Sequence, residues 1–78
     1  MKATVGRIVH YFPISDHGAQ SNHADVVPAI VVSIHGENLC NLRVFVDGNE
    51  NPLWRTSVCQ KSQADENQPY WDWPQIEK

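Results

Sequence analysis

The amino-acid sequence predicts an all-β protein, and three observations support this fold class. Apolar residues recur at every second position over several short stretches, which is typical of strands with one buried face. Clusters of Gly, Pro, Asn, Asp and Ser separate these stretches, as expected for turns and loops. No segment shows a helical period over ten residues. A chain of 78 residues corresponds to one domain, so residues 1–78 are predicted to form a single small β-barrel domain.

Five segments are predicted as strands, and turn-forming residues bound each of them. In chain order the strands are residues 5–12, 28–35, 39–46, 53–60 and 70–73. Pro13 ends the first strand, and residues 13–27 form a long loop rich in Ser, Asp, His and Asn. A tight turn at 35–38 and the turn-rich segment 47–52 connect the next three strands. A polar loop, residues 61–69, leads into the short last strand.

The alternation within the third and fourth strands predicts which residues face the core. These residues are Cys40, Leu42, Val44 and Val46 in the third strand and Trp54, Thr56 and Val58 in the fourth. Matching the two apolar faces predicts the pairs Val46–Trp54, Val44–Thr56 and Leu42–Val58. A shift of one residue would set Arg55 against Val44 and bury its charge.

The same register predicts a shared patch on the opposite face of these strands. Arg43 is expected opposite Ser57, and Arg55 opposite Phe45, with Cβ atoms about 4.5–5.5 Å apart. Two arginines, a serine and an aromatic ring would then lie together, away from the core.

The strand order predicts the architecture. One strand, a long loop, a three-stranded meander, a second loop and a short closing strand are the order of a five-stranded SH3-like barrel. An open Greek-key β-barrel is the alternative. In the SH3-like arrangement the closing strand lies near the long first loop, residues 13–27.

Composition and charge limit the partners. The net charge of −3 argues against binding of duplex nucleic acid through its phosphates. The longest apolar stretch, residues 29–32, is too short to cross a bilayer, and the N-terminus lacks the apolar run of a signal peptide. A cytoplasmic protein without a membrane partner is therefore expected. The cysteines, Cys40 and Cys59, are too few for a disulfide framework, so self-association as a homo-oligomer is expected to support the small core.

The sequence offers groups for binding rather than for catalysis. Arginine suits bidentate recognition of phosphate or carboxylate, and all three arginines lie in apolar strand-like segments: Arg7, Arg43 and Arg55. There is no nucleophile elbow, no phosphate-cradling glycine loop and no HExxH motif, so neither enzymatic activity nor a cofactor is expected. The spacing of acidic and histidine residues in the long loop matches no metal-binding motif, so no metal is expected; these residues are Asp16, His17, His23 and Asp25.

Two tryptophans near the C-terminus allow two interpretations. Trp71 and Trp73 are two residues apart and project from one face of the closing strand. In the first interpretation one ring plugs the barrel and the other packs beneath Pro69 or Pro74. In the second, at least one ring is a platform on which a flat ligand stacks, with Tyr70 beside it.

Motifs along nearly the whole chain resemble a family of small proteins encoded by tailed phages and prophages. The motifs are VGRIVHY, PAIVV, NLRVFVDG, SV at residues 57–58 and the terminal WDWP. The chain departs from the family at residues 68–70, and at Asp72, where family members often have histidine, so a role of that histidine is not carried over. Most members of the family have no assigned function.

The resemblance implies a non-enzymatic binding protein that acts in the cytoplasm of the host cell. By analogy with other compact phage proteins, we expect an anti-defence protein that sequesters a small anionic, nucleotide-like signalling ligand. The predicted ligand-binding residues, which an interface between subunits would bring together, are Arg7, His10, Tyr11, Asn41, Arg43, Phe45, Arg55, Ser57, Trp71 and Trp73. The alternative hypothesis is a protein–protein interaction module that binds a host or phage protein through the same aromatic and arginine residues, or through an exposed PAIVV strand edge.

Overall fold

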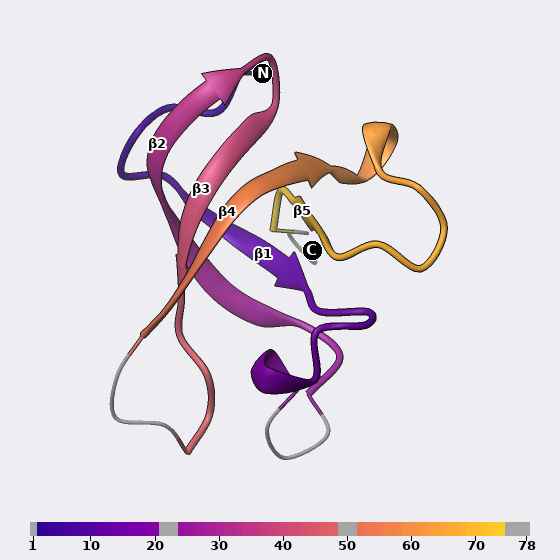
Figure 1. Cartoon of the computed structure of the whole chain (residues 1–78). Helices are drawn as coiled ribbons and strands as arrows, with labels where there is room; N and C mark the ends of the chain where they lie inside the picture. The colour runs from indigo at the N-terminus through magenta and orange to yellow at the C-terminus, as the bar shows by residue number, and fades with distance from the viewer. Residues whose placement is uncertain (1, 21–23, 49–51, 75–78) are drawn as a thin grey trace, which may run out of the picture.

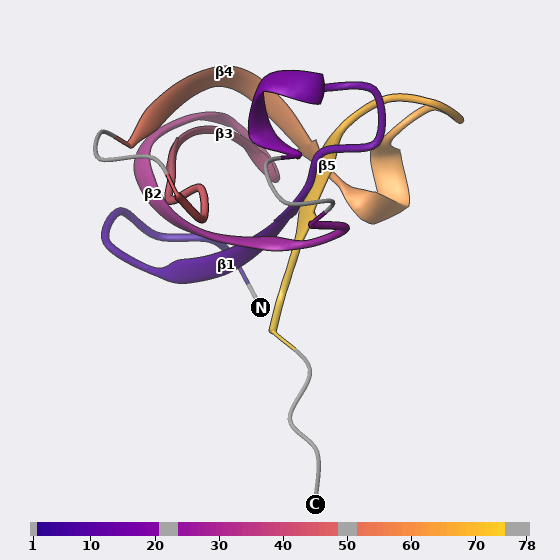
Figure 2. The same ribbon diagram turned by 90° about the horizontal axis from the view of Figure 1, so that it is seen from below.

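The structure, a computed structural model, describes residues 2–20, 24–48 and 52–74. Five strands form a closed barrel in the order β1–β2–β3–β4–β5 (Figures 1 and 2). The strands are β1 (Ile8–Phe12), β2 (Val27–Gly36), β3 (Leu39–Val44), β4 (Leu53–Gln60) and β5 (Tyr70–Asp72). Within these described residues, two single-turn 3₁₀-helices, η1 (His17–Ala19) and η3 (Lys61–Gln63), lie in the connections after β1 and β4. The predicted small five-stranded β-barrel is therefore confirmed, in its closed form rather than the open Greek-key alternative.

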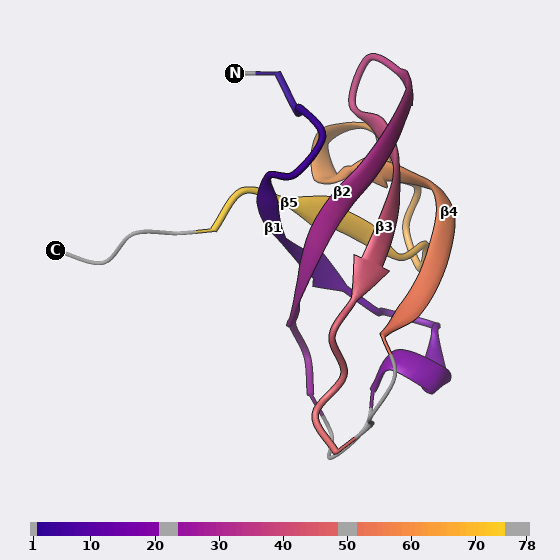
Figure 3. The same cartoon turned by 90° about the vertical axis from the view of Figure 1, so that its left-hand side faces the viewer.

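The barrel closes through β5, the shortest strand. β5 lies beside β1, with which it pairs antiparallel (Figure 3), and it pairs parallel with Cys59 and Gln60 at the end of β4. β2 pairs with β1 on one side and with β3 on the other. The PAIVV segment within β2 is therefore not an open edge, which corrects the prediction that it could accept a partner strand.

The core follows the predicted alternation in β3. Cys40, Leu42, Val44 and Val46 are all buried, as predicted. The largest fully buried side chains are Trp71 of β5 and Tyr11 of β1, which lie opposite each other in the pairing of these two strands. Burial of side chains this large supplies much of the apolar area that stabilises a chain of 78 residues.

The predicted register of β3 and β4 is wrong, because β4 contains a β-bulge. Val44 lies opposite Leu53 and Arg43 opposite Trp54, whereas nearer the end of β4 Val58 lies opposite Cys40. Between these two stretches, residues 56–57 face the single residue Asn41.

The bulge is held by the side chain of Asn41, which is buried. Its Oδ1 atom accepts hydrogen bonds from the Ser57 backbone N–H, at 2.9 Å, and from the Thr56 hydroxyl, at 3.0 Å. Ser57 has a φ of 56°, in the left-handed region that few non-glycine residues adopt. Because the bulge inserts one residue, it exchanges the faces of the residues before it. Val58 is buried as predicted, but Trp54 and Thr56 are exposed.

This exchange also separates the two strand arginines. Arg43 lies opposite Trp54 on the outer face of the barrel, and Arg55 lies opposite the buried Leu42. Adjacent positions in a ladder point to opposite faces of the sheet. The predicted shared patch, with Arg43 opposite Ser57 and Arg55 opposite Phe45, is therefore wrong.

Candidate functional site

Two surfaces hold most of the chemically distinctive side chains, and the first is a cleft beside η1. Figure 2 shows η1 beside β4, where the connection after β1 folds back over the barrel. The cleft has a volume of about 330 Å³. We call it the loop cleft; its lining residues are Tyr11, Ser15, Asp16, Arg55, Thr56, Ser57, Val58, Gln68 and Pro69.

The Asp16 carboxylate is the centre of the loop cleft. Its Oδ2 atom accepts a hydrogen bond from the Tyr11 hydroxyl at 2.7 Å and from Arg55 Nε at 2.6 Å. Arg55 Nη2 donates to Asp16 Oδ1 at 3.2 Å, so the ion pair is bidentate. Arg55 Nη1 also donates to the Trp54 carbonyl at 3.0 Å. Asp16 thereby fastens the connection after β1 to both β1 and β4.

The environment fixes the charges of these three groups. Burial and the hydrogen bond to Asp16 raise the pKa of Tyr11 far above its usual range, so the phenol is neutral. Burial alone would raise the pKa of Asp16, but the hydrogen bonds from Arg55 and Tyr11 outweigh it, and the pKa is lowered. The ion pair with Asp16 in turn raises the pKa of Arg55. The charges of Asp16 and Arg55 therefore cancel, and the loop cleft carries no net charge.

The second surface is a row of side chains on the outer face of β1 to β4. Ile8 lies opposite Ile30, Ile30 opposite Arg43, and Arg43 opposite Trp54. Neighbouring strands are about 4.8 Å apart, so the row extends for about 14 Å across the sheet. Phe45 follows β3 directly, and its backbone N–H donates to the Pro28 carbonyl of β2 at 3.0 Å. We call these five residues, Ile8, Ile30, Arg43, Phe45 and Trp54, the sheet patch.

Three apolar side chains of the sheet patch are exposed to solvent to a large extent. The exposed fractions are 60% for Ile8, 50% for Trp54 and 41% for Phe45. Arg43 is also exposed, and within the described part of the chain its guanidinium makes no hydrogen bond or ion pair. The patch therefore combines aromatic and aliphatic surface with one guanidinium that no carboxylate of the described residues neutralises.

The predicted site residues are divided among different surroundings. Tyr11, Arg55 and Ser57 line the loop cleft, and Arg43 and Phe45 belong to the sheet patch. The remaining predicted residues lie in neither surface: Arg7, His10, Asn41, Trp71 and Trp73. One chain therefore does not bring the predicted residues together in a single site.

The two C-terminal tryptophans have different surroundings. Trp71 has an exposed fraction of 0%, and its Nε1–H donates to the Asn38 carbonyl at 3.1 Å. The interpretation in which one tryptophan fills the core is confirmed, and Trp71 is not accessible as a stacking platform. Trp73 is partly buried and contacts Trp71 edge to face, with ring centroids 5.2 Å apart. The Arg7 guanidinium lies 5.3 Å from the centroid of the Trp73 ring, in a cation–π contact.

Asn41 and His10, the other two predicted residues outside both surfaces, contact neighbouring strands. Asn41 is buried at the bulge. His10 is half-buried on the outer face of β1, where its neighbours are Pro28 of β2 and Asp72 of β5. Asp72 is itself engaged, because its Oδ1 accepts a hydrogen bond from the Trp73 backbone N–H at 3.0 Å.

Two important residues were not among the predicted site residues. Trp54 was predicted in the core, because unbroken alternation in the fourth strand places it on the apolar face. Asp16 was considered only as a metal ligand of the long loop, and no local pattern links it to Arg55, which is 39 residues away. The one sequence signal for the bulge was the amide side chain of Asn41 within an apolar strand.

Of the four loop residues considered as metal ligands, Asp16 and His17 have other partners, and Asp25 is exposed. Asp16 is bound to Arg55, and His17 Nδ1 is 3.0 Å from Gln20 Oε1 in a hydrogen bond. His23 lies outside the described residues. Among the residues that the structure describes, no three His, Cys, Asp or Glu side chains gather to hold a metal ion.

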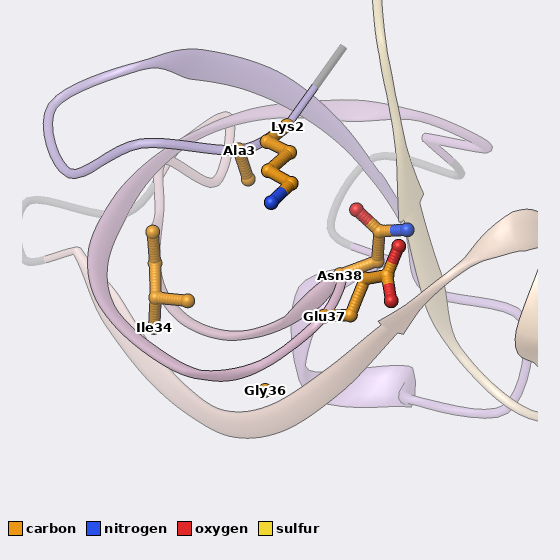
Figure 4. A pocket seen from close by; sticks show the side chains of 6 residues that line it. All are labelled: Lys2, Ala3, Ile34, Gly36, Glu37 and Asn38. Carbon is orange, nitrogen blue, oxygen red and sulfur yellow. The ribbon is translucent and has the colours of Figure 1, made fainter.

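A second pocket lies at the other end of the barrel, between the N-terminal segment and the β2–β3 turn (Figure 4). It has a volume of about 270 Å³ and is lined by Lys2, Ala3, Ile34, Gly36, Glu37 and Asn38. Lys2 and Glu37 are both exposed, and the pocket contains none of the predicted site residues. This pocket therefore shares no lining residue with the loop cleft or the sheet patch.

Comparisons with known proteins give no match. No protein-family model matches this chain, and no curated protein or solved structure matches it significantly. The resemblance to small phage proteins therefore stays a prediction. Neither of the described helical turns is long enough to cross a membrane.

Proposed function

We propose that this protein is a non-catalytic protein–protein interaction module that binds its partner through the sheet patch. The observation that carries the proposal is the position of Arg43, which has no ion pair in the described chain and lies between Ile30 and the half-exposed Trp54. Tryptophan and arginine are the residue types most enriched at the energetic centres of protein interfaces. Exposed apolar surface of this kind is typical of an interaction site.

The shape of the sheet patch favours a protein over a small molecule. Pockets that bind small molecules enclose most of the ligand surface. Neither of the two cavities described above contains a residue of the sheet patch. A small ligand on the patch would leave one side in water, whereas a protein surface that follows the curved outer face of the barrel would cover the row. Burying the exposed halves of Ile8 and Trp54 would contribute roughly 1 kcal/mol each.

The surroundings of the three arginines give less support to a nucleotide-like ligand. Arg7 lies against Trp73, Arg55 is paired with Asp16, and Arg43 is on the outer face. In the loop cleft, a phosphate bound by Arg55 would also approach the Asp16 carboxylate. Only an interface between subunits would combine these arginines into one anion site.

Photo-crosslinking tests the proposal. A photoreactive phenylalanine analogue replaces Trp54 in one variant and Gln63, an exposed residue of η3, in a control variant. We expect a discrete adduct with one cellular protein from position 54 and none from position 63. The adduct partner, once identified by mass spectrometry and purified, is titrated against the wild type and against Trp54→Ser.

The titration decides the outcome. We expect the Trp54→Ser exchange to weaken binding of the purified partner at least about tenfold, as for a central interface tryptophan. Equal adducts from both positions, or equal affinity of wild type and Trp54→Ser, would contradict the proposal. Thermal melting of each variant shows whether a loss of binding reflects a loss of fold.

A further inference from the structure

We infer that the partner presents a carboxylate flanked by apolar side chains, and that Arg43 binds this carboxylate when the sheet patch is covered. This inference rests on the proposed function and specifies the chemistry of the partner. Across the sheet, Ile30, Arg43 and Trp54 are successive neighbours on β2, β3 and β4. A partner that covers the apolar residues on both sides must also cover the guanidinium between them.

A covered guanidinium needs an anionic acceptor. Arginine stays protonated in proteins, so Arg43 cannot escape the cost of burial by losing its charge. A buried charge without a counter-charge is strongly destabilising. A carboxylate supplies both the opposite charge and two acceptors that match the guanidinium geometry. A partner surface made only of apolar groups would therefore bind poorly at this position.

The described chain does not supply that carboxylate itself. Asp72 is on β5, which is separated from β3 by β4, and its Oδ1 accepts the hydrogen bond from the Trp73 backbone N–H. Asp47 follows Phe45 by two residues and already takes part in an interaction. Asp16, the acceptor of Arg55, belongs to the loop cleft. The acceptor for Arg43 is therefore expected from the partner.

Two other occupants fit the patch less well. In a two-fold dimer formed by the patch, residues near the symmetry axis lie close to their own copies, so Arg43 at the middle of the row would lie near the second Arg43, with no carboxylate supplied. A nucleic acid offers phosphates, but the net charge of −3 repels a polyanion, and four of the five patch residues are apolar. A protein segment with one acidic residue among apolar ones matches both the charge and the hydrophobicity of the patch.

A selection experiment tests this inference. The probe is a displayed library of segments tiled from the proteins of the cell that expresses this chain. Segments are selected on the wild type, on Arg43→Glu, on Trp54→Ser and on Lys61→Glu, which makes the same charge change on η3, outside the patch. Thermal melting confirms that each variant is folded.

We expect segments selected on the wild type to contain Asp or Glu next to apolar residues, and to be lost with Trp54→Ser. Arg43→Glu should weaken their binding at least about tenfold, whereas Lys61→Glu should leave it within about twofold. Exchange of the selected acidic residue for Lys should then restore binding to Arg43→Glu. This charge swap identifies Arg43 as the direct contact.

The outcomes separate this inference from the proposed function. Segments that depend on Trp54 but show no excess of acidic residues over the input library would overturn the inference and leave the proposed function standing. The absence of any segment that depends on Trp54 would overturn both. Equal weakening by Arg43→Glu and Lys61→Glu would reduce the role of Arg43 to long-range charge and overturn the inference. If the wild type self-associates and Trp54→Ser abolishes this self-association, the patch binds a second copy of the chain. That result would also overturn the inference.

Discussion

Arg43 and Arg55 come from neighbouring positions of the β3–β4 ladder, yet their side chains meet opposite conditions. Arg55 lies on the face of Leu42 and is bound by Asp16, whereas Arg43 lies on the outer face beside Trp54 and has no ion pair in the described chain. The charge of Arg55 in the loop cleft is thus paired within the described chain, whereas the charge of Arg43 in the sheet patch is not. This difference supports the proposal that Arg43 lies at an interaction site, whereas Arg55 makes a structural contact.

The two regions should differ in how much they contribute to the stability of the fold. The contacts of Asp16 hold the connection after β1 against the barrel, together with the hydrogen bond from Ser15 Oγ to the Asn67 carbonyl at 3.0 Å. Loss of these contacts should affect folding. Loss of a side chain of the sheet patch should affect only binding, because these side chains contribute little to the core.

The largest expected effect is that of Asp16→Ala. The exchange leaves the Arg55 guanidinium and the Tyr11 hydroxyl, both partly shielded from water, without their common acceptor. We expect a loss of about 2 kcal/mol in the free energy of unfolding, measured by urea denaturation. The matched exchange in the other region, Arg43→Ala, should change stability by less than about 0.5 kcal/mol. Equal losses in the two variants would remove the distinction between the regions.

The contribution of Asp16 should also depend on pH. Its pKa in the folded protein is lowered from 3.8: burial opposes the shift, but the hydrogen bonds from Arg55 and Tyr11 outweigh it. A lowered folded pKa means that the stabilisation is fully present above pH 3.8 and is lost as the pH falls through the folded value. The stability difference between wild type and Asp16→Asn should therefore shrink below about pH 4. A difference that stays constant from pH 7 to pH 3 would show that the ion pair does not contribute.

A smaller effect is expected at the bulge that separates the two arginines. Ser57 has a φ of 56°, which glycine adopts without strain, so Ser57→Gly should stabilise the protein by about 0.5–1 kcal/mol. Thr56→Gly, at a position without positive φ, should instead destabilise by a similar amount, about 0.5–1 kcal/mol. Both are measured by urea denaturation. A loss of stability in Ser57→Gly would mean that contacts of the Ser57 side chain outweigh the backbone strain.

The smallest effect is expected from nucleotides. Because the charges in the loop cleft cancel and the sheet patch is not a pocket, a panel of mono-, di- and cyclic nucleotides should shift the melting temperature by less than about 1 °C. Thermal shift and tryptophan fluorescence measure this directly. A rise of several degrees with one nucleotide class would instead support the small anionic ligand, and an oligomeric site that combines arginines from different subunits.

The strands and the barrel could be predicted because they depend on local pattern. Turn residues bound each strand, and the alternation in β3 placed Leu42 and Val44 correctly in the core. The bulge in β4 could not be predicted in this way, because it is held by Asn41, which is 16 residues before Ser57. Trp54 and Arg55 consequently exchanged their predicted faces.

The same reason limited the prediction of the candidate site. Residue type alone identified Tyr11, Arg55 and Ser57, which do share the loop cleft. It did not identify Asp16 as the partner of Tyr11 and Arg55, since the position of a loop carboxylate depends on how the whole connection folds back. Whether the charge of Arg43 or Arg55 was paired therefore depended on the position of an acceptor such as Asp16, which residue type alone does not predict.

The short closing strand has a consequence for the folding kinetics. Trp71 pairs with Tyr11, and 60 residues separate the two in sequence (71 − 11). Contacts between such distant residues form slowly, because most of the chain must be ordered before they meet. The indole of Trp71 becomes fully buried only when the two ends of the barrel come together. In stopped-flow refolding, the emission of Trp71 and of its neighbour Trp73 should therefore report the final closure of the barrel, while the half-exposed Trp54 changes little.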